Sequence, residues 1–177
     1  MAETRNKVLF IGYGFNGEPG LDSLLREGSF DIVGVVTPPP GKNRYRTNPN
    51  DKLPVEKLAY DHKIPILQTN HEDDIQGLID TKVPDSVLIC VYNKIFSNEL
   101  LSSIPTFYNI HHGNLPEWRG SSSSEWAIIT GRNEITLTLH EVVPELDSGD
   151  IFWQDTVRVG HNETIVDMRR KMNESLK

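Results

Sequence analysis

Cysteine, positive charge and long apolar runs are all scarce in this sequence. Its 177 residues contain one cysteine, Cys90, so no disulfide can form within the chain, and a reducing compartment is expected. The apolar run of residues 8–11 is too short for the core of a signal peptide or for a membrane span. Lys and Arg number 18 against 25 Asp and Glu, and the net charge of -7 disfavours binding to phosphate backbones. We therefore expect a cytoplasmic protein that acts on neither membranes nor nucleic acids.

The chain does have the length and composition of one ordinary domain. Hydrophobic residues make up 37% of it and charged residues 24%, which is too apolar for a disordered chain. Neither an internal repeat nor a linker divides the sequence, so residues 1–177 are expected to form a single domain. Cys90 lies in an apolar run, residues 87–91, and is expected to be a small buried hydrophobe.

Apolar runs alternate with helical patterns over the first two thirds of the chain. The runs rich in β-branched residues predict strands at residues 8–11, 32–36, 64–67, 86–91 and 107–110. The patterns with helical spacing predict helices at residues 20–27, 55–62 and 98–103, with a long polar loop at residues 38–53. Strands that alternate with helices are typical of βαβ units, so the fold class is α/β with a largely parallel sheet.

The last third of the chain has a different pattern. Residues 134–140 alternate strictly between apolar and polar side chains, which predicts a half-buried strand. A turn-rich loop follows at residues 144–150, and a further strand is expected at residues 151–159. A helix is expected from residue 163 to the end, with Asn162 as its N-cap.

A glycine motif follows the first expected strand. Residues 12–17 fit the pattern G-x-G-x-x-G, which can bring a pyrophosphate close to a helix N-terminus. The second strand, however, ends in Thr37 and three prolines, without the acid that would hold a ribose hydroxyl, and Glu18 follows the motif. The glycines therefore indicate a tight strand-to-helix turn, and a nicotinamide-dependent Rossmann oxidoreductase remains as the competing interpretation.

The residues best suited to chemistry lie at the end of the strand at residues 107–110. Asn109 and His111 are two apart, so their side chains share one face of the sheet at its carboxyl edge, where open α/β sheets bind ligands. A carboxamide beside an imidazole can stabilise an oxyanion and move a proton. A carboxylate would orient the imidazole; Asp147 is the first candidate for it and Asp150 the second.

The same stretch resembles the folate-dependent formyltransferases, which include methionyl-tRNA formyltransferase, glycinamide ribonucleotide transformylase and the sugar N-formyltransferases. The resemblance covers nearly the whole chain, and its motifs are Asn109-Ile110-His111, Leu115-Pro116, Trp118-Arg119-Gly120 and Asp147-Ser148-Gly149. It implies a Rossmann-like open, mostly parallel sheet flanked by helices, with an antiparallel strand in the C-terminal part. It also implies that Asn109, His111 and Asp147 are catalytic.

The resemblance further implies a formyl donor, N10-formyltetrahydrofolate, and an amine acceptor. The donor would lie between two loops whose residues are Val91, Tyr92, Asn93, Lys94, Ile95 and Phe96 on one side and Val143, Pro144 and Glu145 on the other. The expected acceptor is a small-molecule amine, with a nucleotide-linked amino sugar as one candidate, because neither a second domain nor a basic charge favours tRNA. A formyltetrahydrofolate hydrolase is the alternative within the family. No metal is expected, and assembly into a homo-oligomer is left open.

Several positions depart from the family pattern or allow two interpretations. Gly113 and Asn114 replace a Ser and a Leu, and His112 stands where small residues or Pro are usual. His140, on the polar side of its strand, either faces the site or packs against it. Residues 121–124 are all serines and are expected to cap and begin a helix. The basic side chains of the long loop either are solvated or grip an acceptor phosphate; they are Lys42, Arg44 and Arg46.

Overall fold

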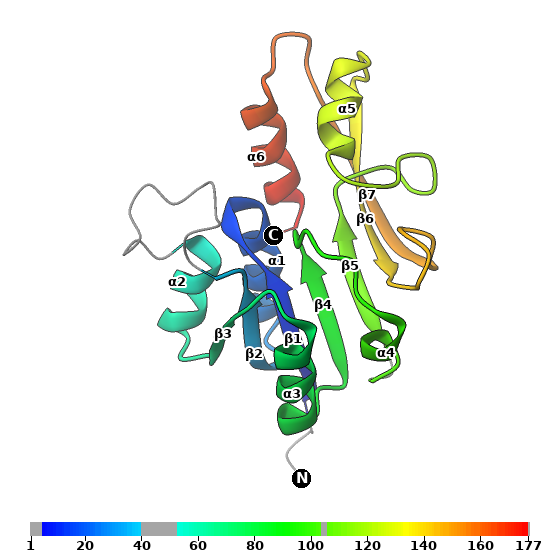
Figure 1. The fold of residues 1–177 in the computed structure, drawn as a ribbon. Helices are drawn as coiled ribbons and strands as arrows, with labels where there is room; N and C mark the ends of the chain where they lie inside the picture. The colour runs from blue at the N-terminus through cyan, green and yellow to red at the C-terminus, as the bar shows by residue number, and fades with distance from the viewer. Residues whose placement is uncertain (1–4, 40–52, 104–105, 177) are drawn as a thin grey trace.

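A computed structural model describes residues 5–39, 53–103 and 106–176, and its centre is one seven-stranded sheet (Figure 1). The strand order is β3-β2-β1-β4-β5-β6-β7. The strands are β1 (Asn6–Gly12), β2 (Phe30–Thr37), β3 (Ile66–Gln68), β4 (Ser86–Cys90), β5 (Phe107–His111), β6 (Glu134–Glu141) and β7 (Ile151–Arg158). Lys42, Arg44 and Arg46 lie outside the described residues.

Strand direction separates the two ends of the sheet. The pairs β1–β2, β2–β3, β1–β4 and β4–β5 are parallel, whereas β5–β6 and β6–β7 are antiparallel. It follows that β6 alone runs against the other six strands. The predicted fold class, an open and mostly parallel sheet with an antiparallel strand in the C-terminal part, is therefore confirmed.

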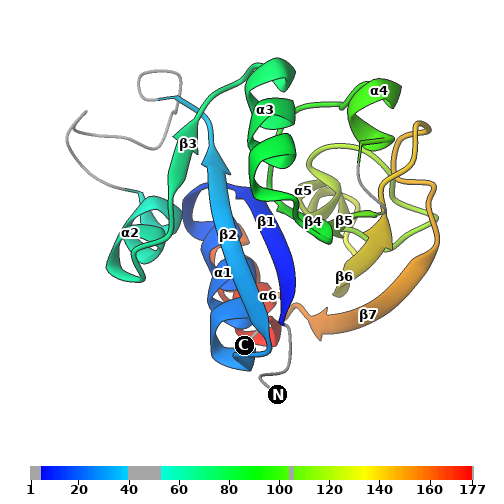
Figure 2. The same ribbon diagram turned by 90° about the horizontal axis from the view of Figure 1, so that it is seen from below.

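Helices cover both faces of this sheet, as Figure 2 shows. The helices are α1 (Gly14–Glu27), α2 (Pro54–Asp61), α3 (Glu72–Lys82), α4 (Asn98–Leu101), α5 (Ser123–Ile129) and α6 (Ile165–Ser175). One core packs α1, α2, α5 and α6 against the sheet through residues such as Leu21, Ala59 and Met168. The second core packs α3 and α4 against the opposite face through Ile75, Ile79 and Leu100. The fold thus has three layers, with the sheet in the middle.

Side chains along β5 alternate between the two cores, and this alternation places the polar residues of the site. Phe107 belongs to the core under α3 and α4, and Ile110 belongs to the core under α1 and α6. Asn109 and His111 therefore share the face of Phe107, because successive side chains of a strand point to opposite faces. The expectation that these two polar side chains share one face of the sheet is confirmed.

Three expectations about local structure were wrong. The helix α3 was missed, although Ile75, Leu78 and Ile79 have helical spacing, because acidic residues and Gly77 interrupt the pattern. The helix α1 begins at Gly14 rather than at residue 20, because the glycine motif forms its first turn. The cap of α6 is Thr164 rather than Asn162, and its side chain accepts the backbone N–H of Asp167 in a capping box.

Two further corrections concern polar residues. The strand β6 is buried on both sides, since Thr136, Thr138 and His140 are buried together with the apolar set. Thr138 is buried because it contacts the neighbouring loop. The Thr138 hydroxyl donates to the carbonyl oxygen of Gly113 at 2.8 Å. The serine run does begin α5, but its N-cap, Ser122, has φ of 61° and its side chain makes no capping hydrogen bond.

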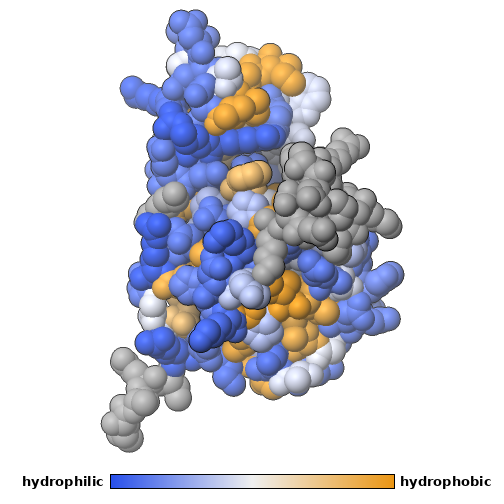
Figure 3. All heavy atoms as spheres, turned by 90° about the vertical axis from the view of Figure 1, so that its left-hand side faces the viewer, coloured by the Kyte–Doolittle hydropathy of each residue, from blue (hydrophilic) through white to orange (hydrophobic). Residues whose placement is uncertain are grey.

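The side of the molecule seen in Figure 3 is mostly hydrophilic where it is coloured. Figure 3 shows that hydrophobic residues on one side of the molecule gather in separate patches that hydrophilic residues divide. No helix of the described residues is long and apolar enough to cross a bilayer.

Candidate active site

The candidate site is built on the carboxyl end of β5 and on the neighbouring strand β6. Asn109 pairs with His140 across the two strands, and His111 pairs with Thr138. Direct cross-strand partners in an antiparallel pair point to the same face. The structure therefore brings His140 beside Asn109 and His111, a placement that the sequence pattern left undecided.

His140 holds the carboxamide of Asn109 in one orientation. The His140 Nδ1 atom lies 2.7 Å from the carbonyl oxygen of Glu141, so this nitrogen carries a proton and donates it. Burial lowers the pKa of His140, which keeps the ring neutral and leaves a lone pair on Nε2. That lone pair accepts a hydrogen bond from Asn109 Nδ2 at 3.1 Å. The other N–H of the carboxamide makes no hydrogen bond within the described residues.

His111 faces two hydrogen-bond acceptors. Its Nε2 donates to the carbonyl oxygen of Trp118 at 2.8 Å, and its Nδ1 lies 3.5 Å from Asp147 Oδ2. Both neighbours are hydrogen-bond acceptors, so each ring nitrogen of His111 faces an oxygen atom. The Asp147 contact is longer than an ordinary hydrogen bond. Within the described residues Nδ1 therefore makes no short hydrogen bond, and a bridging water could join it to a substrate.

Gly113 explains one departure from the family pattern. A Cβ atom at this position would lie 2.5 Å from His111 Nε2 and 2.8 Å from the Trp118 carbonyl oxygen. These are the two atoms of the hydrogen bond that holds the imidazole. Only glycine leaves room for that bond in this loop, so Gly113 is part of how the chain positions His111.

Asp147 reaches both histidines from a tight turn between β6 and β7. Its φ of 48° lies in the left-handed region, which Asp and Asn tolerate better than most residues. The backbone N–H of Gly120 donates to Oδ2 at 2.8 Å, and Oδ1 lies 3.6 Å from His140 Nε2. Asp150 is exposed on the same turn. The structure thus places Asp147, rather than Asp150, beside the imidazoles.

A cavity of about 760 Å³ opens onto the side chains of the candidate site, which are Asn109, His111, His140 and Asp147. Eight of the nine residues expected around the donor line it: Val91, Tyr92, Asn93, Lys94, Ile95, Phe96, Val143 and Pro144. Glu145 does not line it, because its side chain points to the surface and pairs with Arg119 at 3.0 Å. Val142 and Leu146 line it instead. In an irregular loop neither periodicity nor residue type predicts which side chains turn inward.

The glycine motif packs the turn of α1 against β4. A Cβ on Gly12 would lie 2.3 Å from the carbonyl oxygen of Cys90, and one on Gly17 would lie 2.9 Å from the same atom. Gly14 has φ of 70°, a conformation that favours glycine. Backbone packing and turn geometry therefore account for all three glycines, as the interpretation of a tight turn predicted.

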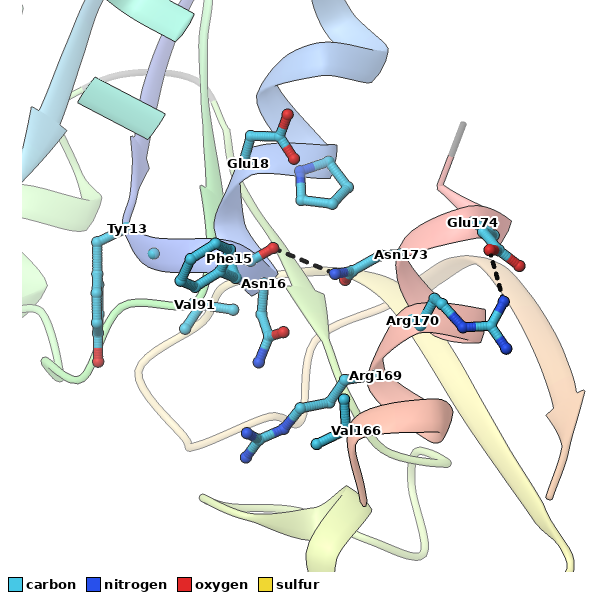
Figure 4. Close-up of a pocket in the computed structure, with 12 residues that line it drawn as sticks. Tyr13, Phe15, Asn16, Glu18, Val91, Val166, Arg169, Arg170, Asn173 and Glu174 are labelled. Atoms are coloured by element: carbon cyan, nitrogen blue, oxygen red, sulfur yellow. Dashed lines mark hydrogen bonds and ion pairs between the residues drawn. The ribbon is translucent and has the colours of Figure 1, made fainter. Parts of the chain in front are cut away.

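A second cavity of about 450 Å³ lies between α1 and α6 (Figure 4). It shares Tyr13, Asn16, Val91 and Arg169 with the first cavity, so the two adjoin. In the part of the chain that the structure describes, no group of three or more His, Cys, Asp or Glu residues could hold a metal ion. The expectation that no metal takes part stays a prediction.

His112, next to the candidate catalytic histidine, is partly buried, and its Nε2 atom is fully buried. No hydrogen bond reaches its Nε2 atom from the described residues. A buried nitrogen left unpaired costs about 1–3 kcal/mol. Burial, and after it the nearby charge of His111, lower the pKa of His112 to about 4, so the ring is neutral.

Replacing His112 by phenylalanine should make folding stability less sensitive to acid. The folded-state pKa of about 4 lies below the ordinary value of 6.5. Only the unfolded chain therefore takes up this proton as the pH falls from 6.5 toward 4. Wild-type stability should fall by about 2–3 kcal/mol more than that of His112→Phe between about pH 7 and pH 4.5. Urea denaturation at both pH values measures the difference, and equal losses in the two proteins would contradict the expectation.

Known proteins similar to this chain come from one family. Residues 6–176 match the family model described as Formyl transferase. A methionyl-tRNA formyltransferase from Sulfurihydrogenibium sp. (strain YO3AOP1) is 31% identical over 95% of this chain and 55% of its own length. One from Thermotoga maritima is 31% identical over 95% of this chain and 54% of its own length. The chain thus spans about half the length of these curated relatives.

Solved structures show the same fold at lower identity. Phosphoribosylglycinamide formyltransferase from Bacillus halodurans has a TM-score of 0.80 and 20% identity, covering 97% of this chain and 89% of its own. A formyltetrahydrofolate deformylase from Pseudomonas syringae pv. tomato has a TM-score of 0.78 and 24% identity, covering 98% of this chain and 57% of its own. Because the family model matches almost the entire length of this chain, the chain belongs to the formyl transferase family.

Proposed function

We propose that this chain, as a single catalytic domain, transfers a formyl group from N10-formyltetrahydrofolate to the amine of a small molecule. The observation that carries the proposal is the convergence of Asn109, His111 and Asp147 in one cavity. Asn109 and His111 come from β5, and Asp147 comes from the turn between β6 and β7, 36 positions after His111. Such a cluster of hydrogen-bonding and titratable groups in a cleft is typical of an active site.

The larger cavity suits a folate donor. Its volume of about 760 Å³ lies within the range of about 300–1,000 Å³ that small-molecule sites occupy. The loop after β4 offers Tyr92 and Phe96, whose rings are stacked with centroids 5.9 Å apart, and Val143 and Leu146 line the cavity from the other loop. Bound there, N10-formyltetrahydrofolate would supply the formyl group to be transferred.

Asn109 and His111 would stabilise the negative charge that develops on the formyl oxygen during transfer. Asn109 has one N–H committed to His140 and one N–H left for that oxygen. His111 would use Nδ1, whose contact with Asp147 is longer than an ordinary hydrogen bond. A single well-placed donor contributes about 10²–10³ in rate. His140 keeps the carboxamide from flipping and so acts as a positioning residue.

Asp147 would hold His111 in its charged form and help to remove the proton of the acceptor. The acceptor nitrogen gains the formyl carbon and loses one proton, and the nitrogen that releases the formyl group gains one. The carboxylate is held by the backbone N–H of Gly120 and lies near both imidazoles, so a proton can pass along this set.

The acceptor in this proposal is a small amine rather than a tRNA. This chain carries a net charge of -7. An acidic protein attracts a tRNA backbone weakly. A nucleotide-linked amino sugar remains one candidate acceptor, and the cytoplasm is the proposed compartment.

The test is incubation of the purified chain with N10-formyltetrahydrofolate and a panel of amines, followed by mass spectrometry of the products. Formylated amine and free tetrahydrofolate are expected together. Formate released without any acceptor would instead show a hydrolase. A thermal shift with NAD and none with folate would favour the nicotinamide-dependent oxidoreductase and overturn the proposal.

A further inference from the structure

Arg169 occupies the junction of the two cavities. Its side chain lines both of them, and Figure 4 shows that it extends from α6 toward Asn16 in the first turn of α1. About a third of the side chain, 35%, is exposed. A residue in this position can contact any ligand that enters the larger cavity from the side of α6.

An ion pair between helices fixes the direction of this side chain. Arg169 Nη2 donates to Glu125 Oε1 on α5, and Ser124 donates to the other carboxylate oxygen of Glu125 at 2.9 Å. Within the described residues the guanidinium makes no other hydrogen bond. A guanidinium has five N–H donors in a fixed plane. Most of them therefore remain for a ligand, in a geometry that is already set.

Positive charge is rare around the larger cavity. Of the lysines and arginines that the structure describes, only Lys94 and Arg169 line it. Lys94 lies on the loop proposed for the donor, which leaves Arg169 as the cation available to the acceptor. His112 lines the same cavity but is neutral, because burial lowers its pKa to about 4. Among the lysines and arginines that the structure describes, Arg169 is therefore the one placed to offer an anionic acceptor its counter-charge.

Resting on the proposed function, we propose that Arg169 determines acceptor specificity by binding an anionic group, a carboxylate or a phosphate, of the acceptor amine. Arg matches both groups with parallel N–H donors, whereas lysine offers only a point charge. Because the protein as a whole is negatively charged, this local cation is what allows an anionic amine to enter.

The test compares matched amines that differ only in the anion. Ethanolamine is paired with O-phosphoethanolamine, and β-alaninamide is paired with β-alanine, so the two pairs also tell phosphate from carboxylate. Wild type should formylate the anionic member of at least one pair with the higher kcat/KM. Arg169→Gln should lower kcat/KM for that member by about 10- to 100-fold, to the level of its neutral partner, the loss expected for one charge-assisted hydrogen bond. Arg169→Lys should retain part of the preference.

Two controls separate recognition from structure. Arg158→Gln removes an equal charge at a side chain that is 88% exposed and lines neither cavity, and it should keep the preference. Glu125→Gln removes the negative charge but keeps the arginine and an oxygen that can accept its hydrogen bond, so it should also keep the preference. Equal losses in Glu125→Gln and Arg169→Gln, or a loss with both members of each pair, would assign Arg169 a structural role and overturn the inference. So would a wild type that treats both members of each pair alike or formylates neither. Donor cleavage that yields formate but no formylated amine would overturn the proposed function itself.

Discussion

Replacement of His111 by alanine should lower the rate of formyl transfer by about 10²- to 10⁴-fold, the range typical of a lost acid–base group. The imidazole lies beside Asp147 and lines the cavity, so its loss removes a donor to the developing oxyanion and a proton carrier. The donor should still bind, because the two loops that line the cavity are untouched. Single-turnover kinetics with N10-formyltetrahydrofolate measures the rate, and calorimetric titration of the donor measures binding.

The matched control for this variant is His161→Ala. His161 is exposed in the turn before α6 and lines neither cavity, so its removal should leave the rate unchanged. A His111→Ala protein that keeps its melting temperature and transfers the formyl group at the wild-type rate would show that the Asn109, His111 and Asp147 cluster does no chemistry. The melting curve of His111→Ala distinguishes a loss of catalysis from a loss of folding.

Replacement of Gly12 by alanine should destabilise the protein by about 3 kcal/mol, the upper part of the usual range for overpacking. The new methyl group would lie 2.3 Å from the carbonyl oxygen of Cys90, and Gly12 and Cys90 are register partners in the parallel pair β1–β4. Neither strand can move aside without breaking that pairing. Because whole domains are stable by only about 5–15 kcal/mol, the loss should be plain in urea denaturation.

The matched control is Gly77→Ala, for which the opposite effect on stability is expected. Gly77 is exposed inside α3, and a Cβ atom there would meet nothing within 4 Å. Gly77→Ala should therefore stabilise the protein by about 0.5–1 kcal/mol, since alanine loses less backbone entropy in a helix. If Gly12→Ala were as stable as wild type, the close packing of the glycine motif against β4 would be wrong, and a ligand-binding role for those glycines would gain support.

Much of the fold could be read from the sequence because its signals are local. Apolar runs such as residues 8–11 and 86–91 marked the central strands to within two residues at each end. The helix α3 could not be read in the same way, since acidic residues and Gly77 weaken its pattern and packing against β2 and β4 stabilises it instead. The polar side of β6 was also misread, because its burial depends on a loop more than twenty residues earlier in the chain.

By itself the sequence determined that Asn109 and His111 share one face at the end of a strand, because side-chain alternation is a property of neighbouring residues. Only the tertiary structure decided between Asp147 and Asp150, and only it placed His140 beside Asn109. Those contacts join residues more than thirty positions apart, through the antiparallel pairing of β5 with β6 and a turn in which Asp147 has a left-handed backbone. No local pattern encodes such a meeting, because it depends on how strands pair and loops close in three dimensions.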